Sequence, residues 1–558
     1  MRLPRFPILP PWRGLPLAAI CALYLLAGLI GHDPWKNDDA IHFGIAWGLF
    51  KGGDWLIPQL AGSAWLETPP LYYWIAAVCG HLFGNLLPLH DALRLASGLC
   101  GALFLALLAF AGRLLHKASY PQGRGSIERE TGRLAGNAAP LIAIGCLGLL
   151  IPIHDTQPLV ALLAASAVTY GGLALVPLRP VAGGILAGLG LGLGFLASGL
   201  TALINLLPLL LVLPCNRHWR TRAALVGLLV ALTLGALLGA AWPLLLAQQH
   251  PDLLAAWWER AVAGVRYQPE WWRAVPNLAE LLSWFAWPAL PLAFWALWLN
   301  RRHLGQPAIA LPFLGTLTSF IALLLFGEPR PLQALPLLVP LILQAASSVH
   351  LLRRGAANAF DWFGMMTFTI LAGLVWLGGI AMTSGVPQKI AHNFAKLEPG
   401  FVAEFSAPTY AAAALLTLAW LWLIFASPRS HWRGVSHWAA GVTLMWVLLT
   451  ALWLPWIDYG KSYRGVAESL RQSLPHNAKC IAGRDLGSAQ KVSLEYFAGI
   501  RTLPAGTPAG HACPLLLEQG SERAEKTPPG WVKTWEGHRP GDRSERLRLF
   551  RRDAVRER

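Results

Sequence analysis

Acidic residues gather in residues 32–91, the first long stretch between apolar segments. Asp38 and Asp39 stand side by side before Ala40–Phe50, where apolar residues recur at helical spacing. Glu67 follows in the same stretch. A carboxylate held at the start of such a surface helix could take a proton from an acceptor hydroxyl. The alternative is that the two aspartates cap the helix and complement its dipole.

A second ionisable group interrupts two apolar stretches at His154-Asp155-Thr156-Gln157-Pro158. Ionisable groups at membrane depth are costly, so they usually mark a functional cavity or a paired partner. We therefore expect Asp155 and His154 to face the same side of the molecule as Asp38. A plain short turn with a solvated aspartate is the alternative.

Arginines are the third candidate group. Arg260, Arg266, Arg273 and Arg330 lie in short segments on that same side. The planar guanidinium fork can bind a phosphate, although each arginine taken alone is better explained as a surface residue or an ion-pair partner. Arg330, between two apolar segments, is the strongest candidate. The neighbouring tryptophans favour an aromatic belt at a membrane surface; they are Trp257, Trp258, Trp271 and Trp272.

Long apolar segments must position these groups. The chain is 55% hydrophobic and only 13% charged, against roughly 25% charged residues in soluble domains. Segments such as 223–246 and 359–383 reach the roughly 20 residues that cross a bilayer as a helix. The net charge of +16 is spread over short loops, which indicates membrane orientation and not a nucleic-acid partner.

The apolar segments alone leave the number of spans ambiguous, because Pro69–Gly84 is short for a span and begins with two prolines. The distribution of Lys and Arg between the loops decides this case. We interpret Pro69–Gly84 as an interfacial segment, since aromatic amphipathic segments lie at membrane surfaces. Thirteen spans then remain, at residues 15–31, 92–115, 138–152, 159–176, 181–197, 200–214, 223–246, 282–300, 307–326, 332–351, 359–383, 408–427 and 436–456.

This arrangement places eighteen Lys or Arg on the side of Arg2, Arg5 and Arg13 and eight in the loops between spans on the other side. The positive-inside rule then predicts a cytoplasmic N-terminus and an external C-terminus. Because no A-x-A cleavage site follows the first apolar run, we interpret that run as a retained span and not as a signal peptide.

The composition changes after Trp456. We predict a membrane domain over residues 1–457 and a small soluble α/β domain over residues 458–558. In the latter, Ser462–Ser473 has helical spacing, and short apolar runs between Pro and Gly turns predict strands; these runs are Lys479–Ala482, Leu515–Glu518, Trp531–Trp535 and Leu547–Phe550. Cys480 and Cys513 both fall there, either as a disulfide or as two free thiols.

Three runs in the first outer loop resemble one family. They are Asp38-Asp39-Ala40-Ile41-His42-Phe43-Gly44-Ile45-Ala46, then Gly53-Asp54-Trp55-Leu56-Ile57-Pro58, then Glu67-Thr68-Pro69-Pro70-Leu71-Tyr72-Tyr73-Trp74. This order resembles the bacterial GT-C glycosyltransferases, namely the ArnT-type aminoarabinose transferases of lipid A and the related protein O-mannosyltransferases. Weaker likeness continues at Ala92-Leu93-Arg94-Leu95, at Asp155 and at Gly194-Phe195-Leu196-Ala197-Ser198-Gly199.

The resemblance implies an all-α polytopic membrane protein with thirteen transmembrane helices, two periplasmic surface helices after the first span, and an outer C-terminal domain. It implies transfer of a sugar from a polyprenyl-phosphate carrier to a hydroxyl of lipid A, a polysaccharide or a protein outside the bacterial inner membrane. By analogy Asp38, beside Asp39, would be the general base and Asp155 a second acid. Glu67 would organise the site or help to hold a divalent metal ion.

The chain departs from the family pattern at three places. Thr68 stands where the family has the lysine of E-K-P-P, and Ser198 stands where a lysine precedes Gly199. Ile41-His42 replaces an Arg-Tyr pair. Because the missing lysines lie where the family meets carrier phosphate, Arg330, Arg266 or His154 would have to replace them, or the donor differs.

Two other functions fit parts of the sequence. A transporter or flippase of lipid-linked sugars would usually show repeated halves and polar groups near the midplane, and we find no such halves. A catalytically inactive assembly protein of envelope-glycan synthesis is the second alternative, and the missing lysines favour it.

Overall fold

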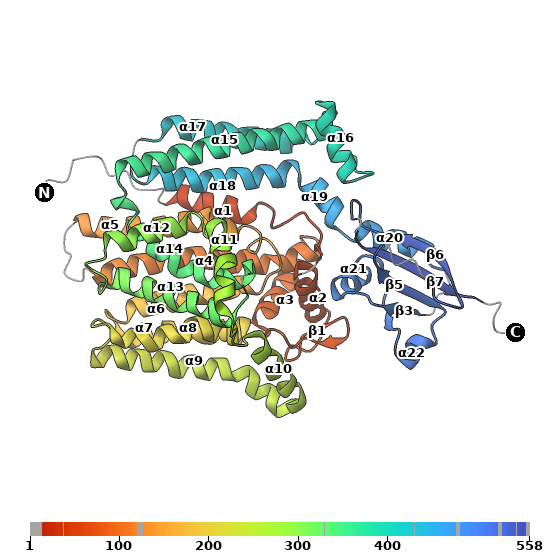
Figure 1. Cartoon of the computed structure of the whole chain (residues 1–558), viewed down its shortest axis with the longest axis horizontal. Coiled ribbons are helices and arrows are strands. Elements are labelled where there is room, and N and C mark those ends of the chain that lie inside the picture. The colour runs from red at the N-terminus through yellow and green to blue at the C-terminus, as the bar shows by residue number, and fades with distance from the viewer. Residues whose placement is uncertain are drawn as a thin grey trace.

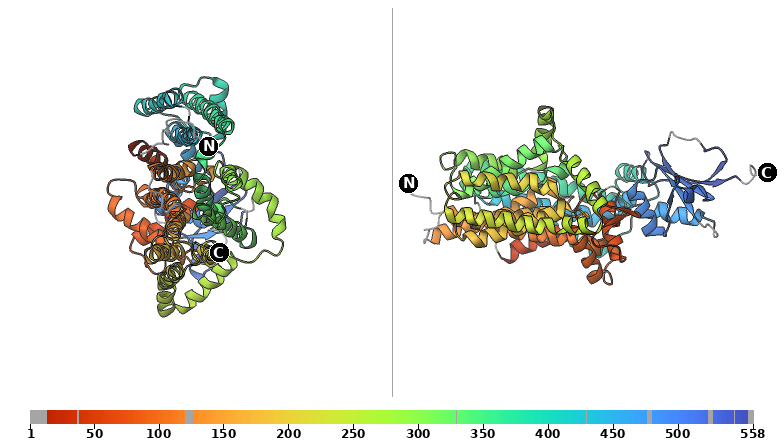
Figure 2. Two further views of the ribbon diagram at one scale, coloured as in Figure 1. Left: turned by 90° about the vertical axis from the view of Figure 1, so that its left-hand side faces the viewer. Right: turned by 90° about the horizontal axis from the view of Figure 1, so that it is seen from below.

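The computed structural model describes residues 14–36, 38–119, 126–328, 330–428, 430–475, 480–522, 527–542 and 544–553. A long helical bundle and a smaller C-terminal α/β unit, residues 464–552, lie end to end along the long axis of the molecule (Figures 1 and 2). We call the end of the bundle that contacts this unit the docked end.

Nineteen α-helices form the bundle part of the described chain. They are α1 (Leu15–Leu26), α2 (Asp38–Phe50), α3 (Leu71–Phe83), α4 (Leu89–Ser119), α5 (Ser126–Gly145), α6 (Leu159–Leu175), α7 (Pro180–Ser198), α8 (Leu200–Val212), α9 (Arg222–Gln249), α10 (Pro251–Gly264), α11 (Val275–Phe285), α12 (Ala289–Leu299), α13 (Pro307–Phe326), α14 (Pro331–Ala346), α15 (Arg354–Ser384), α16 (Gln388–Leu397), α17 (Ala407–Ala426), α18 (Arg433–Leu452) and α19 (Leu454–Lys461). A two-stranded ribbon, β1 (Gln59–Leu60) and β2 (Ser63–Ala64), lies between α2 and α3.

Within the described ranges, seven helices are long and apolar enough to cross a membrane, and eight if the bent pair Trp271–Phe285 and Ala289–Leu299 forms one span. Five shorter apolar helices accompany them. Helices lie within all thirteen predicted spans, but they do not match them one to one: the predicted span 138–152 gives way to a turn after Gly145, and the predicted span 282–300 covers the break between α11 and α12, which are bent by 99°.

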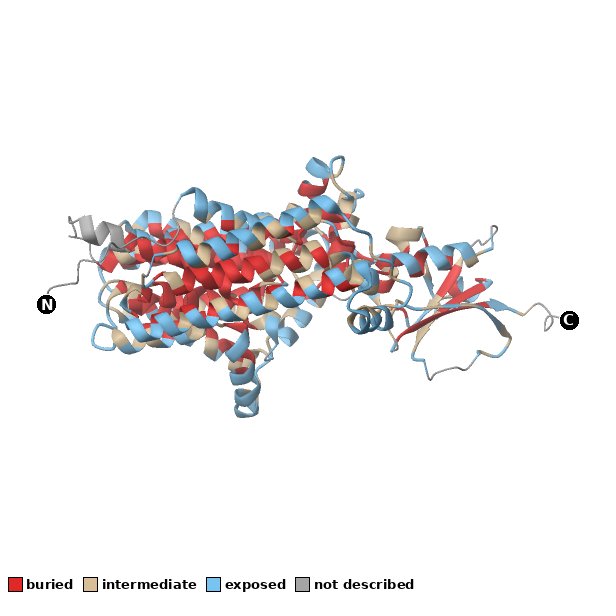
Figure 3. Ribbon diagram, turned by 90° about the horizontal axis from the view of Figure 1, so that it is seen from above, coloured by how far each residue is buried: buried red, intermediate tan, exposed pale blue. Residues whose placement is uncertain are grey.

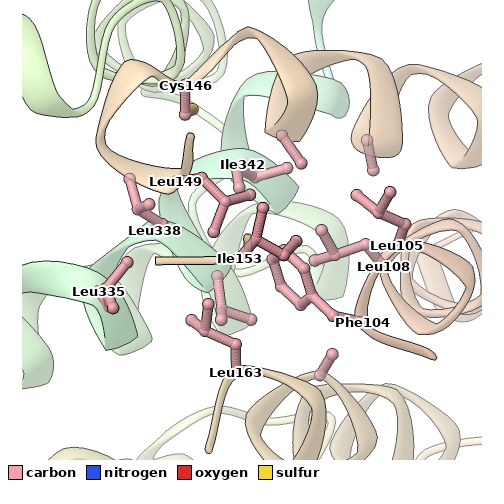
Figure 4. Close-up of a cluster of buried hydrophobic side chains, with 14 of the residues drawn as sticks. Phe104, Leu105, Leu108, Cys146, Leu149, Ile153, Leu163, Leu335, Leu338 and Ile342 are labelled. Carbon is pink, nitrogen blue, oxygen red and sulfur yellow. The ribbon is translucent and has the colours of Figure 1, made fainter. Parts of the chain in front are cut away.

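Small residues and interlocking aliphatic side chains hold the bundle together. A Cβ added at Gly184 of α7 would lie 2.1 Å from the Gly227 carbonyl oxygen of α9, so these helix backbones touch. In the centre, side chains of α4, α6, α14 and residues 146–153 point toward one another (Figure 4). Buried residues concentrate inside the bundle (Figure 3), whereas the outward face of α17 exposes large apolar side chains such as Trp422 and Phe425, as a lipid-facing helix does.

Helices α2 and α3 lie at the docked end, between the bundle and the C-terminal unit (Figure 1). The predicted surface helix is α2, which starts at Asp38. At thirteen residues α3 measures about 20 Å, and its buried face packs on α4 and α2. Because α1 and α8 are equally short, length does not separate α3 from the predicted spans, and the exclusion of Pro69–Gly84 stays a prediction.

The C-terminal unit contains a five-stranded sheet of order β4-β3-β5-β7-β6. Strand β3 runs parallel to β4 and β5, and β7 runs antiparallel to β5 and β6. The elements are α20 (Arg464–Ser473), β3 (Ile481–Arg484), α21 (Ser488–Ala498), β4 (Leu503–Pro504), α22 (Pro508–His511), β5 (Leu515–Gly520), β6 (Trp531–Gly537) and β7 (Arg546–Arg552). Leu515 and Leu517 face one apolar cluster and Leu516 faces another, because both faces of β5 are covered.

The sequence-based expectations for this unit hold in outline. A helix and four of the five strands were expected, with β3 displaced toward Arg484; Lys479 lies outside the described residues. Helix α21, strand β4 and the short helix α22 were not predicted. Cys480 and Cys513 form a disulfide, which settles the alternative that the sequence left open.

Candidate active site

The predicted acidic residues converge at the docked end. The residues after α1, the first turn of α2, the start of α4, the turn at residues 154–158 and α19 meet there, as their mutual hydrogen bonds show. Each segment is polar at a helix end, where backbone groups need partners outside the helix.

Arg94 of α4 lies at the centre of this junction and is fully buried. Its guanidinium donates to Asp91 Oδ1 at 2.9 Å and to the His32 carbonyl at 3.2 Å, and it lies 3.6 Å from Asp39 Oδ2. A buried charge is tolerated only when it is paired and hydrogen-bonded. Arg94 therefore ties α4 to the loop after α1 and to α2.

Asp39 is a positioning residue in this structure. Its Oδ2 accepts the Trp35 N–H at 2.9 Å, its Oδ1 accepts the Thr156 N–H at 2.8 Å, and Arg94 lies beside it. Burial alone would raise the pKa of Asp39, but Arg94 and these N–H donors hold it below its usual value. The carboxylate thus fixes α2 to the turn that carries Asp155, and its oxygens are already engaged. This differs from the predicted catalytic role of Asp39.

Three carboxylates remain without partners. Within the described part of the chain, Asp38, Glu67 and Asp155 accept no hydrogen bond and form no ion pair through their side chains. They lie close enough to influence one another, because the charge of Asp38 contributes to raising the pKa of both others. The sequence-based expectation that these residues share one side is consistent with this arrangement.

The three carboxyl groups differ in proton affinity. Burial, and then the neighbouring Asp39, raises the pKa of Asp155 to about 8. Burial also raises the pKa of Asp38. The Asp155 carboxyl group is therefore largely protonated at pH 7. The Asp38 side chain, in turn, is exposed to solvent. A pair of carboxyl groups with separated pKa values suits one for accepting a proton and the other for donating a hydrogen bond.

Two cations stand beside these free carboxylates. The charge of Arg260, on α10, lowers the pKa of Glu67, and that of Lys461, at the end of α19, lowers the pKa of Asp155. Both cationic side chains are exposed. Arg260 was considered from the sequence. Lys461 was not predicted as a site residue, because it follows the last predicted span and falls within the predicted soluble domain, residues 458–558.

The predicted phosphate ligands Arg330 and Arg266 lie elsewhere on the surface. Arg330 is exposed and forms an ion pair of 2.6 Å with Glu328. Arg266 is exposed too, and the Gln268 N–H nearby donates to the Leu325 carbonyl at the end of α13. The described contacts join neither arginine to the three free carboxylates.

His154 is a buried part of the scaffold. Its Nδ1 lies 2.5 Å from the Leu150 carbonyl oxygen and its Nε2 lies 2.6 Å from that of Tyr24. Burial lowers the pKa of this imidazole to about 4, so it is neutral at pH 7. With both ring nitrogens facing backbone carbonyls, His154 offers no nitrogen to a phosphate, contrary to our expectation.

Two of the residues that depart from the family pattern, Thr68 and His42, belong to one neutral network. The Trp65 indole N–H donates to Thr68 Oγ1 at 2.9 Å, which lies 3.0 Å from Tyr73 Oη, which in turn lies 2.8 Å from His42 Nδ1. Burial lowers the pKa of His42 to about 4, so this ring is uncharged at pH 7. Two of the replaced positions, Thr68 and His42, are therefore linked through one tyrosine hydroxyl.

The third departure lies close to the first-loop motif. Ser198 ends α7, and Gly199 follows with φ of +60°. A Cβ at Gly199 would lie 3.5 Å from Pro69 Cδ and 3.6 Å from Trp257 Cζ2. The break between α7 and α8 thus packs on the Glu67-Thr68-Pro69-Pro70 run, although about 130 residues separate them in sequence.

Glu67 was also the predicted metal ligand. A divalent ion needs several oxygen or nitrogen ligands that converge. Across the described ranges, no group of three or more His, Cys, Asp or Glu side chains is placed to hold a metal ion. The neighbours that act electrostatically on Glu67 are Arg260 and Asp38.

The C-terminal unit and α19 complete the junction. Asp458 Oδ1 accepts the Asp33 N–H at 2.9 Å and the Trp35 indole N–H at 2.8 Å. Asp33 in turn accepts from Ser462 Oγ at 2.6 Å and from Arg464 Nε at 2.9 Å. More than 420 residues separate these partners, so local sequence signals could not reveal them.

The chain is similar to known proteins both in sequence and in fold. No protein-family model matches the chain. The undecaprenyl phosphate-alpha-4-amino-4-deoxy-L-arabinose arabinosyl transferase of Edwardsiella ictaluri is 26% identical over 449 residues, which cover 77% of this chain and 75% of that protein. The protein of the same name from Serratia proteamaculans is 27% identical over 458 residues, covering 79% and 76%.

A solved structure extends the likeness to almost the whole chain. The crystal structure of ArnT from Cupriavidus metallidurans bound to undecaprenyl phosphate matches with a TM-score of 0.66 at 15% identity, over 96% of this chain and 97% of that one. This match shows the fold. Together with the curated relatives, it agrees with the resemblance seen in the first-loop motifs: the chain is similar in sequence to transferases of the ArnT type and shares the fold of ArnT.

Proposed function

We propose that this protein is a membrane glycosyltransferase that moves a sugar from a polyprenyl-phosphate carrier to the hydroxyl group of an acceptor. The observation that carries the proposal is the group of unpartnered carboxylates at the docked end, Asp38, Glu67 and Asp155, in a chain whose relatives are named as undecaprenyl-phosphate sugar transferases.

The reaction requires one proton acceptor. The acceptor oxygen attacks the anomeric carbon of the sugar, the bond from that carbon to the phosphate oxygen breaks, and the carrier leaves as a polyprenyl monophosphate. Asp38 takes the proton of the attacking hydroxyl, because its carboxylate is exposed, unpartnered and raised in pKa. Asp155, protonated at neutral pH, donates a hydrogen bond without adding a negative charge beside the phosphate.

The donor phosphate needs positive charge nearby. The neutral network of Trp65, Thr68, Tyr73 and His42 supplies none. Arg260 is the cation beside Glu67, and a guanidinium can pair with a phosphate in a forked arrangement. The contacts of Arg330 and Arg266 give these two arginines no corresponding support.

We also propose the membrane arrangement that the charge pattern predicts. Thirteen segments cross the bacterial inner membrane, the N-terminus is cytoplasmic, and the site and the C-terminal unit are periplasmic. The eighteen-to-eight distribution of Lys and Arg supports this orientation. A disulfide in the C-terminal unit suits an oxidising compartment. A reporter fused after Gly136 should be cytoplasmic and one after Tyr459 external; the reverse would overturn the scheme.

Envelope analysis tests the proposed function. Mass spectrometry of lipid A, surface polysaccharide and glycoproteins should reveal a glycan mass that is absent from a deletion strain and restored by the wild-type gene. The Asp38→Asn variant should insert normally but restore about 100-fold less product or lower, the size expected for a lost general base. Asp252→Asn is the matched control, since Asp252 is an exposed aspartate in the first turn of surface helix α10.

Two results would contradict the proposal. If Asp38→Asn restores the product as well as wild type does, the assignment of the base is wrong. If deletion changes no lipid-A, polysaccharide or protein glycan, the protein is not a transferase of this kind, and an inactive assembly role becomes the better interpretation.

A further inference from the structure

One ammonium group at the docked end, that of Lys461, has no hydrogen-bond or ion-pair partner among the described residues. Lys461 ends α19, and its side chain is exposed. Its Nζ lies over the indole ring of Trp35, 4.2 Å from the ring centroid. Among the residues that the structure describes, this Nζ donates no hydrogen bond and has no carboxylate within ion-pair distance. All three of its N–H groups are available to a ligand.

The indole below this ammonium is firmly held. The Trp35 indole N–H donates to Asp458 Oδ1 at 2.8 Å, and its backbone N–H donates to Asp39 Oδ2 at 2.9 Å. The His32 ring packs against it with centroids 4.2 Å apart. A lysine over a fixed aromatic face gains a cation–π contact and loses part of its freedom. Lys461 is therefore more restrained than an ordinary surface lysine.

The same contacts place Lys461 beside the proposed site. The carboxylate of Asp39 accepts one N–H from Trp35 and one from Thr156, the residue after Asp155. Trp35 and Asp155 consequently flank a single carboxylate. Lys461 and Asp155 also influence each other electrostatically, since each changes the pKa of the other.

The charges favour an anion at this place. Partial desolvation lowers the pKa of Lys461, so an anionic ligand would stabilise its charged form. Asp155, the free carboxyl group whose charge acts on Lys461, is largely protonated at pH 7 and repels an anion little. Ligand oxygens between Lys461 and Asp155 would therefore meet an ammonium and a hydroxyl-type donor at once.

We propose that Lys461, supported on Trp35, binds the phosphate of the isoprenoid monophosphate carrier. The inference rests on the proposed function and adds to it a phosphate-binding cation contributed from beyond the last span. The alternative is that Lys461 is an ordinary surface lysine. In that case its replacement would not change the affinity for the lipid phosphate.

Binding measurements can distinguish a phosphate-binding Lys461 from a surface lysine without such a role. The full-length protein in phosphatidylcholine nanodiscs is titrated with radiolabelled undecaprenyl phosphate and, in parallel, with undecaprenol, which lacks the phosphate. Lys461→Met should weaken binding of undecaprenyl phosphate about ten-fold or more, as expected for the loss of one charge-assisted contact. It should leave binding of undecaprenol unchanged, and Lys461→Arg should recover most of the lost affinity.

Lys396→Met is the matched control, because Lys396 is an exposed lysine near the end of another surface helix, α16; it should bind both lipids as wild type does. If Lys461→Met binds undecaprenyl phosphate within about twofold of wild type, or loses affinity equally for both lipids, the inference is wrong although the proposed function stands. If the wild-type protein does not prefer undecaprenyl phosphate to undecaprenol, the proposed function fails and the inference fails with it.

Discussion

Replacing Asp39 by asparagine should destabilise the protein, whereas the same change at its neighbour Asp38 should not. Both oxygens of Asp39 accept backbone N–H groups, from Trp35 and Thr156. An asparagine has a single acceptor oxygen, so its NH₂ group must face one of these donors. The buried Arg94 also loses one of its two carboxylate neighbours.

The magnitude follows from these contacts. One unsatisfied buried N–H costs about 1–3 kcal/mol. Breaking a buried ion pair by removing one partner costs about 3–5 kcal/mol, less here because Asp91 still pairs with Arg94. We therefore expect a loss of about 3–5 kcal/mol in the free energy of unfolding at pH 7. Because the folded-state pKa of Asp39 lies below its unfolded value, its contribution is present above about pH 4 and is lost as the pH falls further.

Thermal unfolding of the purified protein in detergent, followed by size-exclusion chromatography, measures this difference. Asp39→Asn should unfold at least about 5 °C below wild type, and Asp38→Asn should unfold at the wild-type temperature while transferring no sugar. An Asp39→Asn protein that keeps wild-type stability but loses transfer would show that Asp39 takes part in the chemistry, which would refute its assignment as a positioning residue.

Three further outcomes are expected. Affinity for undecaprenyl phosphate should fall above about pH 8, because Asp155 then gains a negative charge. Asp155→Asn should abolish this pH dependence, and the same pH profile in the wild-type and Asp155→Asn proteins would contradict the prediction. Gly44→Ala would place its Cβ 2.5 Å from Val492 Cγ2 of α21 and cost about 1–3 kcal/mol, so hydrogen exchange in α21 should accelerate, and adding Val492→Ala should reverse the effect. Removing the Cys480–Cys513 disulfide, which spans 33 residues, should lower the unfolding free energy of the C-terminal unit by about 3–4 kcal/mol; chemical denaturation with and without reductant measures it, and equal curves would disprove it.

Local patterns in the sequence predicted much of the architecture. Helical periodicity and an acidic pair placed the start of α2 at Asp38, and the balance of Lys and Arg separated the short α3 from the spans. Helix α21 was not predicted, because its buried face mixes Val492 and Leu494 with small or polar residues such as Ala489 and Ser493, which weakens the amphipathic signal. Strand β4 has only two residues, too few for a pattern.

The candidate site was predictable only in part, for a physical reason. Residue type and position identified Asp38, Glu67 and Asp155, but could not show which carboxylates are already hydrogen-bonded. Asp39 resembles Asp38 in sequence and differs from it only through contacts with distant segments. The role of Lys461 depends on Trp35, more than 400 residues earlier, and no local pattern reports such a pair.

The junction between α19 and the loop after α1 has a consequence for how the protein is made. Asp33 and Trp35 leave the ribosome early, but Asp458 and Arg464, which hold them, are synthesised after every span. Lys36 likewise forms its ion pair with Glu545, which is synthesised more than 500 residues later. Until α19 and the C-terminal unit have been synthesised and folded, the loop after α1 lacks these contacts. A chain that ends before α19 therefore lacks the hydrogen bonds that Asp458, Ser462 and Arg464 form with Asp33 and Trp35.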